Sequence, residues 1–248
     1  DPYVRSHPLS RERVANYTRG AEQSAYRNVE DSAELRHRHK MAQAKIRGFL
    51  EHPSTTLRRY PTRNTDMPSR YARAIALHRR GQTDAALTEI EGLIAETPTS
   101  PWFHELKGQV NYEAGRAADG LAAYEKSVAL APDQPLLLIG LATTQLSLGE
   151  GSDAMSQEFN RAAENNLRAA LRLDSTNTTA YFQLSKVFGQ MQRVAYAEWA
   201  LAEYYALLGR REALKHAQRA LQGLPNGSPE KIRTTDILQI ARAGQADR

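Results

Sequence analysis

The sequence predicts an all-α protein, most of which is a solenoid of repeated helical hairpins. Three observations lead to this prediction. Gly81, Gly115 and Gly149 follow one another at intervals of 34 residues. Pro98 and Pro132 each lie 17 residues after one of these glycines. The chain contains no convincing run of alternating β-branched residues, so no sheet is expected.

A 34-residue period with glycine in the middle of the repeat and proline near its end is typical of the tetratricopeptide (TPR) repeat. We expect two helices in each repeat. Each glycine should adopt the left-handed conformation in the turn between the helices, and the proline should end the second helix. Five residues after each glycine comes a small residue, which lets the two helices approach closely: Ala86, Gly120 and Ala154.

The first 66 residues do not follow this period and are predicted to form a short helical region and a linker. Ser10 precedes one short helical stretch. The residues from Asp31 to Glu34 form a capping box that opens a second helix. His52-Pro53 ends that helix, and residues 57–69, which contain two prolines, are interpreted as a linker before the array.

The TPR-like array is predicted to span residues 67–225, with repeats at 67–100, 101–134, 135–177 and 178–225. The third repeat is longer than the 34-residue period by about nine residues. We expect this insertion, around residues 150–160, to form a longer loop or to extend the second helix. The fourth repeat is irregular, because the period is lost there. Residues 226–248 are predicted to form a capping helix over the exposed end of the stack.

Composition excludes several classes of site. The chain has no cysteine, which rules out disulfides, thiolate metal sites and cysteine nucleophiles. The longest uncharged run, at residues 134–149, is too short to span a bilayer, so no transmembrane segment is predicted.

No catalytic constellation is recognisable in the sequence. His104 and Glu105 begin an HExxH pattern, but residue 108 is glycine, so the second histidine ligand of a zinc site is missing. No nucleophile elbow, Walker loop or dinucleotide fingerprint occurs. We therefore predict no catalytic residue and no cofactor for this chain, and expect it not to be an enzyme.

The positive charge of the chain lies in its first quarter. Residues 1–66 hold 13 Lys and Arg against 8 Asp and Glu, whereas residues 67–248 hold 20 of each. The basic run at residues 36–40 has two interpretations, which are contact with nucleic acid or anionic lipid and an ordinary solvated helix face. Nucleic acid is the less favoured partner, because no aromatic residues interleave with the charges.

One segment near the start resembles a known family. Ser6-His7-Pro8, followed by Arg13-Val14, resembles the (S/T)HP-x-x-x-x-R-(I/V) stretch that follows the catalytic core of HExxH zinc metallopeptidases of the HtpX/BepA-like family. Further blocks resemble members with a C-terminal TPR region, namely Ile46–Leu50 with Arg58–Pro61, Phe103–Gln109, and Ser228-Pro229 with Arg233 and Asp236–Leu238.

The resemblance implies that the chain is the region after the protease core, excised from a longer protein. The HExxH helix is absent, so zinc would be bound only by the parent metallopeptidase, where His7 could act as an inhibitory metal ligand. The resemblance further implies a periplasmic location and a role in envelope and outer-membrane protein quality control. The partners would be the missing protease domain, unfolded envelope proteins or an outer-membrane assembly complex. A free-standing TPR scaffold or co-chaperone that binds peptide segments is the alternative.

In TPR arrays the first helix of each hairpin lines the face that receives partners. The predicted repeat boundaries place nine residues on this face: Tyr71, Ile75, Trp102, Glu105, Gln109, Tyr112, Ile139, Phe182 and Lys186. Aromatic residues mixed with a few charges suit the binding of an extended or helical peptide. The aromatic residues have an equally good alternative role in packing between repeats.

Overall fold

The computed structural model describes residues 10–151 and 153–246, and within them every regular element is a helix. This confirms the predicted all-α class. The contacts divide the chain into two compact units, with the boundary between Gln43 and Ala44. The first unit contains α1 (Ser10–Gln23) and most of α2 (Ala33–Leu50).

The helices of the first unit are largely exposed to solvent. In α1 even the apolar residues Val14 and Tyr17 are exposed. The start of α2 is capped by Ser32, whose Oγ accepts a hydrogen bond from the backbone N–H of Leu35 at 3.1 Å. The structure therefore has a simple N-cap in place of the predicted capping box: Ser32 and not Asp31 is the cap, and the residue three positions later is Leu35, which has no carboxylate to return the hydrogen bond.

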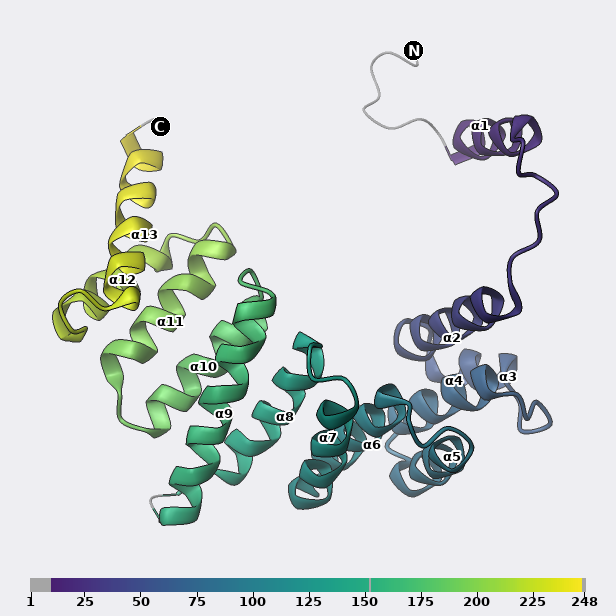
Figure 1. The fold of residues 1–248 in the computed structure, drawn as a ribbon, viewed down its shortest axis with the longest axis horizontal. Helices are drawn as coiled ribbons and strands as arrows, with labels where there is room; N and C mark the ends of the chain where they lie inside the picture. The colour runs from purple at the N-terminus through teal and green to yellow at the C-terminus, as the bar shows by residue number, and fades with distance from the viewer. Residues whose placement is uncertain (1–9, 152, 247–248) are drawn as a thin grey trace. The chain divides into compact units, whose positions relative to one another are not determined.

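The second unit is a row of helices in which neighbours along the chain pack side by side (Figure 1). Close pairs are formed by α4 with α5, α6 with α7, α8 with α9, α10 with α11, and α11 with α12. The helices of this unit after α2 are α3 (Pro53–Arg59), α4 (Met67–His78), α5 (Thr83–Glu96), α6 (Pro101–Glu113), α7 (Ala117–Leu130), α8 (Pro135–Leu148), α9 (Ala154–Leu173), α10 (Thr178–Gln190), α11 (Val194–Leu207), α12 (Glu212–Gly223) and α13 (Pro229–Ala246).

The segment between α3 and α4 is shorter and more ordered than the predicted linker. Only residues 60–66 lie outside helices, because α4 begins at Met67. Asp66 caps α4 by accepting the backbone N–H of Ser69 at 3.1 Å. The guanidinium of Arg73 donates hydrogen bonds to the carbonyls of Tyr60, Pro61 and Asn64, which satisfies the backbone of this loop: the distances are 3.3, 3.0 and 3.1 Å.

Two of the three repeat glycines take the predicted left-handed conformation. Gly81 has φ 72° and Gly115 has φ 76°. After each of them the next backbone N–H returns to a carbonyl five residues earlier, at 3.0 Å after Gly81 and 2.9 Å after Gly115. This is the Schellman arrangement that ends one helix and starts a reversal of direction.

Gly149 does not follow this prediction, since its φ is −82°. Glycine is needed there for a different reason. The side-chain amide of Asn160 donates to the Gly149 carbonyl at 2.9 Å, and a Cβ at residue 149 would lie only 2.8 Å from Asn160 Oδ1. Gly151, with φ 146°, provides the unusual backbone conformation in this turn.

The extra residues of the third repeat lie mainly in its second helix. α9 has 20 residues, whereas α5 and α7 have 14 each. The next hairpin turn contains Gln192 with φ 57°, and Arg193 N–H returns to the Phe188 carbonyl at 2.8 Å. Gln192 therefore occupies the position that glycine has in the earlier turns. Gly209, with φ 64°, takes the same position between α11 and α12.

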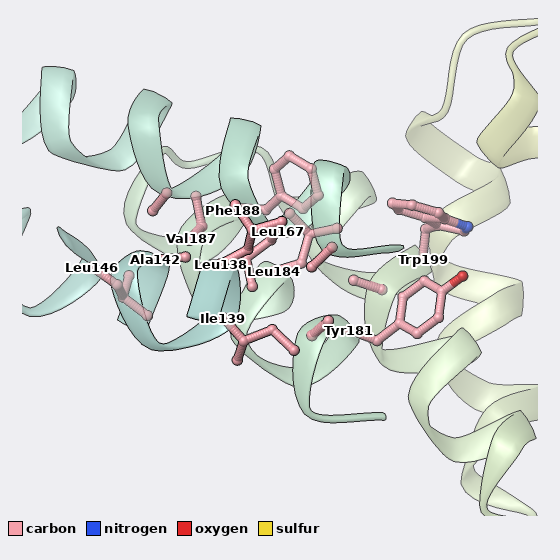
Figure 2. Packing of buried hydrophobic residues seen from close by; sticks show 14 of the residues in the cluster. Leu138, Ile139, Ala142, Leu146, Leu167, Tyr181, Leu184, Val187, Phe188 and Trp199 are labelled. Carbon is pink, nitrogen blue, oxygen red and sulfur yellow. The ribbon is translucent and has the colours of Figure 1, made fainter. Parts of the chain in front are cut away.

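The largest described group of buried side chains extends from α8 through α9, α10 and α11 to α12, and Figure 2 shows part of it. Leu138, Leu167, Leu184 and Phe188 point toward one another in this cluster (Figure 2). Trp199 extends it to α11 and meets the ring of Tyr181 edge-on, with centroids 6.0 Å apart. The apolar area buried here holds α10 between its neighbours.

Candidate protein-binding surface

The first helices of the hairpins, α4, α6, α8 and α10, carry the predicted partner-binding residues. The structure places Tyr71, Ile75 and Ile139 in the interior, so we correct the prediction for these three. They are packing residues, because a buried side chain reaches a partner only if the repeat opens. Tyr71, for example, meets the ring of Phe103 edge-on at 5.5 Å.

The first repeat is covered by the end of α2. A Cβ at Gly48 would lie 2.9 Å from the Cβ of Ile75, so the two helices are in close contact there. Arg79, which follows α4 directly, fixes this contact by donating a hydrogen bond to the Gly48 carbonyl at 3.0 Å. Ala44 is also fully buried. Local sequence patterns did not reveal this cover, because residues 1–66 lie outside the repeat period.

Of the other six predicted residues, Glu105 is also buried, and five keep exposed or half-buried side chains. We call Trp102, Gln109, Tyr112, Phe182 and Lys186 the first-helix surface. Lys186 lies over the Phe182 ring, with Nζ 4.8 Å from its centroid. Gln109 donates a hydrogen bond to Glu113 at 2.8 Å. That these residues contact a partner remains a prediction.

Glu105 belongs to the same face of α6 but is only 7% exposed. Lys45, from the end of α2, lies over it: its Nζ is 3.6 Å from Glu105 Oε2 and 5.3 Å from the centroid of the Trp102 ring. Burial raises the pKa of the Glu105 carboxyl, and the positive charge of Lys45 opposes this rise. A carboxylate, an indole and an ammonium group thus meet at the edge of the first-helix surface.

A tyrosine outside the predicted set positions α6 against α8. The ring of Tyr124, from α7, fits between Gly108 and Gly140, and a Cβ on either glycine would overlap it. Burial raises the pKa of the Tyr124 hydroxyl, with the charge of Glu105 adding to the rise. The spacing of these two glycines sets how closely the first helices of the second and third repeats approach.

Solved structures with the same arrangement include MamA and the Cut9–Hcn1 assembly of the APC/C. MamA has a TM-score of 0.50 and 16% identity, with 71% of this chain and 97% of that chain covered. The Cut9–Hcn1 structure has a TM-score of 0.55 and 17% identity, with 82% and 42% covered. The fold is a TPR helical solenoid.

A third similar structure is TTC0263, a thermophilic TPR protein in Thermus thermophilus. It has 20% identity and a TM-score of 0.44, with 75% of this chain and 99% of that chain covered. No protein-family model matches the chain, and no curated protein matches it in sequence.

At the other end of the TPR array, aromatic rings form a continuous series that the sequence analysis did not identify. Phe182 contacts Tyr204, and Tyr204 contacts Tyr205, with centroids 5.3 and 5.0 Å apart. Tyr205 stacks on His216, whose Nδ1 is 2.6 Å from the Glu198 carboxylate. The adjacent tyrosines of α11 were a signal for such a cluster. Phe182 is thus part of a packed series as well as an exposed ring.

The described residues contain no group of three or more His, Cys, Asp or Glu placed to hold a metal ion. His104 instead hydrogen-bonds through Nε2 to the Pro98 carbonyl at 3.0 Å. His7, the metal ligand implied by the resemblance, lies outside the residues that the structure describes. No helix in the described part of the chain is both long and apolar enough to cross a membrane.

Proposed function

We propose that the TPR array is a protein-interaction scaffold that binds peptide segments of partner proteins along the first-helix surface. The observation that supports this most directly is Trp102, which is 38% exposed although the neighbouring Phe103 is buried. Indole side chains that are partly exposed beside polar groups are frequent anchors of protein interfaces. In this proposal the chain itself performs no chemistry.

The TPR fold does not by itself identify a function, since one fold carries many activities. The proposal therefore rests on the chemistry of the surface. Phe182 and Lys186 of α10 form a pair of aromatic ring and charge like the one that Trp102 of α6 forms with Lys45 of α2. Rings and charges on two of the first helices fit a peptide that contacts more than one repeat.

The proposal can be tested by selecting peptides from a random display library on the full chain and measuring their affinity by calorimetry. Trp102→Ala should weaken the binding of selected peptides about 30-fold, the effect of losing an aromatic anchor. The matched control is Leu173→Ala, which removes an exposed apolar residue from the second helix α9 and should leave the affinity unchanged. A library that yields no ligand, or equal affinity for Trp102→Ala, would contradict the proposal.

A more specific form of this function places the scaffold next to an HExxH zinc metallopeptidase in the periplasm, in envelope and outer-membrane protein quality control. The support is the order of the sequence blocks around Ser6-His7-Pro8, Ile46–Leu50 and Phe103–Gln109. Ile46 and Leu50 add to it, because they are exposed four residues apart on α2 and offer an apolar contact to another domain or protein.

This specific form makes two predictions. The coding sequence upstream of Asp1 should contain an HExxH helix, and a natural gene that begins near Asp1 would exclude it. Zinc should belong to that upstream domain, so metal analysis of the present chain should find no stoichiometric zinc. The more general scaffold proposal survives either result.

A further inference from the structure

Trp102 and Glu105 lie three residues apart on α6, which places their side chains on the same face of the helix. Trp102 is partly exposed, whereas Glu105 is almost fully buried beneath this face. Together they combine an aromatic ring with a carboxylate. Both groups attract a cation, the ring through its π-electrons and the carboxylate through its charge.

The cation present at this position is held loosely. Lys45 Nζ is 3.6 Å from Glu105 Oε2, which is beyond hydrogen-bonding distance. Glu105 Oε2 is buried and has no hydrogen-bond donor among the described residues, and the neighbouring Tyr71 hydroxyl likewise has no hydrogen-bond partner among them. A buried carboxylate oxygen without a donor is costly, so a cation that approached more closely would be favoured.

The Lys45 side chain is not the main contact that holds α2 in place. It is 32% exposed, and its helix is anchored by other residues, chiefly Ala44 and Gly48. Lysine has a long and flexible stem, so its ammonium group can exchange between the pocket and solvent.

We propose that Trp102 and Glu105 form a pocket for a lysine or arginine side chain of a bound peptide, and that Lys45 is an internal competitor for this pocket. The inference rests on the proposed function, because it assigns a basic residue to the partner at one end of the first-helix surface. Arginine is the better ligand of the two, since its planar guanidinium can donate two hydrogen bonds to Glu105 while stacking on the indole.

The experiment uses the full chain and three probes: N-acetyl-arginine amide, N-acetyl-lysine amide and the uncharged N-acetyl-norleucine amide. Binding is followed by the ¹⁵N-indole NMR signals. The chain has two tryptophans, and the buried Trp199 serves as an internal reference for Trp102. In Lys45→Met, which keeps the apolar stem without the charge, both cationic probes should bind about tenfold more tightly than in the wild type.

Two control variants separate the pocket from a purely structural ion pair. Lys45→Arg retains a competing cation, so it should not raise the affinity of the cationic probes. Glu105→Gln in the Lys45→Met background should remove the preference for the cationic probes over the norleucine probe. If Lys45→Met melts early, Lys45→Gln replaces it. Equal probe affinity in wild type and the charge-removed variant, or equal binding of all three probes, would overturn the inference and leave Lys45 a structural residue.

The outcome is separable from that of the proposed function. If library peptides bind and depend on Trp102 but the cationic probes do not respond to Lys45→Met, only the pocket is refuted. If the probes respond as expected but the library yields no peptide, the pocket stands as a cation site and the scaffold proposal fails.

Discussion

The attachment of the last helix can be tested through a second buried glutamate. Glu203, on α11, is 1% exposed, and its Oε1 accepts a hydrogen bond from Arg233 Nε of α13 at 2.9 Å. The side chain of Arg233 is itself half exposed. Arg233→Met keeps the stem that packs along α11 and removes the charge, so Glu203 would remain in the interior without its partner.

The size of the effect follows from this geometry. Removing one partner of a buried ion pair costs about 3–5 kcal/mol. The lower end applies here, because Arg233 is partly solvated and the carboxyl can escape the penalty by taking up a proton. A glutamate with the ordinary pKa of 4.5 in the unfolded chain needs about 3 kcal/mol to be protonated at pH 7, which sets an upper limit on this penalty. We therefore expect Arg233→Met to weaken the attachment of α13 by about 3 kcal/mol at pH 7.

Contacts in a solenoid are local, so this loss should release α13 before the rest of the array unfolds. Hydrogen exchange of backbone amides in residues 229–240 should become about a hundredfold faster, while exchange in α6 and α8 should not change. The double variant Glu203→Gln with Arg233→Met should recover much of the protection, since no charge is then buried. Unchanged exchange of α13 in Arg233→Met would refute the reasoning.

The pH dependence provides an independent check. Burial raises the pKa of Glu203 in the folded chain, and loss of Arg233 raises it further. A carboxyl whose folded pKa lies above its unfolded value contributes stability that is complete below the unfolded pKa and is lost as the pH rises through the folded pKa. The effect of Arg233→Met on exchange should therefore be smaller at pH 5 than at pH 8.

Two further predictions concern backbone positions. Gln192→Gly should stabilise the chain by about 0.5–1 kcal/mol, because a non-glycine residue at φ 57° is strained. The measurement is urea unfolding, and a lower urea midpoint would show that the Gln192 side chain contributes more than its strain costs. Gly140→Ala should destabilise the chain by about 1–3 kcal/mol, because the added Cβ would overlap the ring of Tyr124. Gly189→Ala is the control: it lies in a helix with no atom near the added Cβ, so it should be neutral or stabilising. Equal midpoints for the two alanine variants would contradict this packing account.

The repeated hairpins were predictable because their signals are local. Gly81 and Gly115 mark turns through a conformation that glycine adopts at no steric cost, and their spacing alone gives the repeat. Gln192 makes the same turn without such a signal, between the closely packed helices α10 and α11. Gly149 shows the opposite case, in which a glycine in phase with the others serves the approach of Asn160.

The candidate site was less predictable, because it depends on contacts between distant segments. Helical spacing correctly grouped Trp102 with Glu105 on one face of α6. It could not indicate that the end of α2 covers Ile75, nor that Lys45 reaches Glu105 across 60 positions of sequence. A pattern of residues within one helix specifies a face, but only the tertiary structure decides what lies on it.

The two buried glutamates of the array differ in a way that bears on function. Glu203 is bonded at 2.9 Å to an arginine from the next element, which is the arrangement expected of a structural connection between helices. Glu105 faces an ammonium group at 3.6 Å and retains an oxygen without a donor. A buried ion pair seldom stabilises a fold more than apolar residues of similar volume would. Stability therefore gives little reason for Glu105 to be a carboxylate, whereas binding the cation of a partner beside Trp102 gives a direct one.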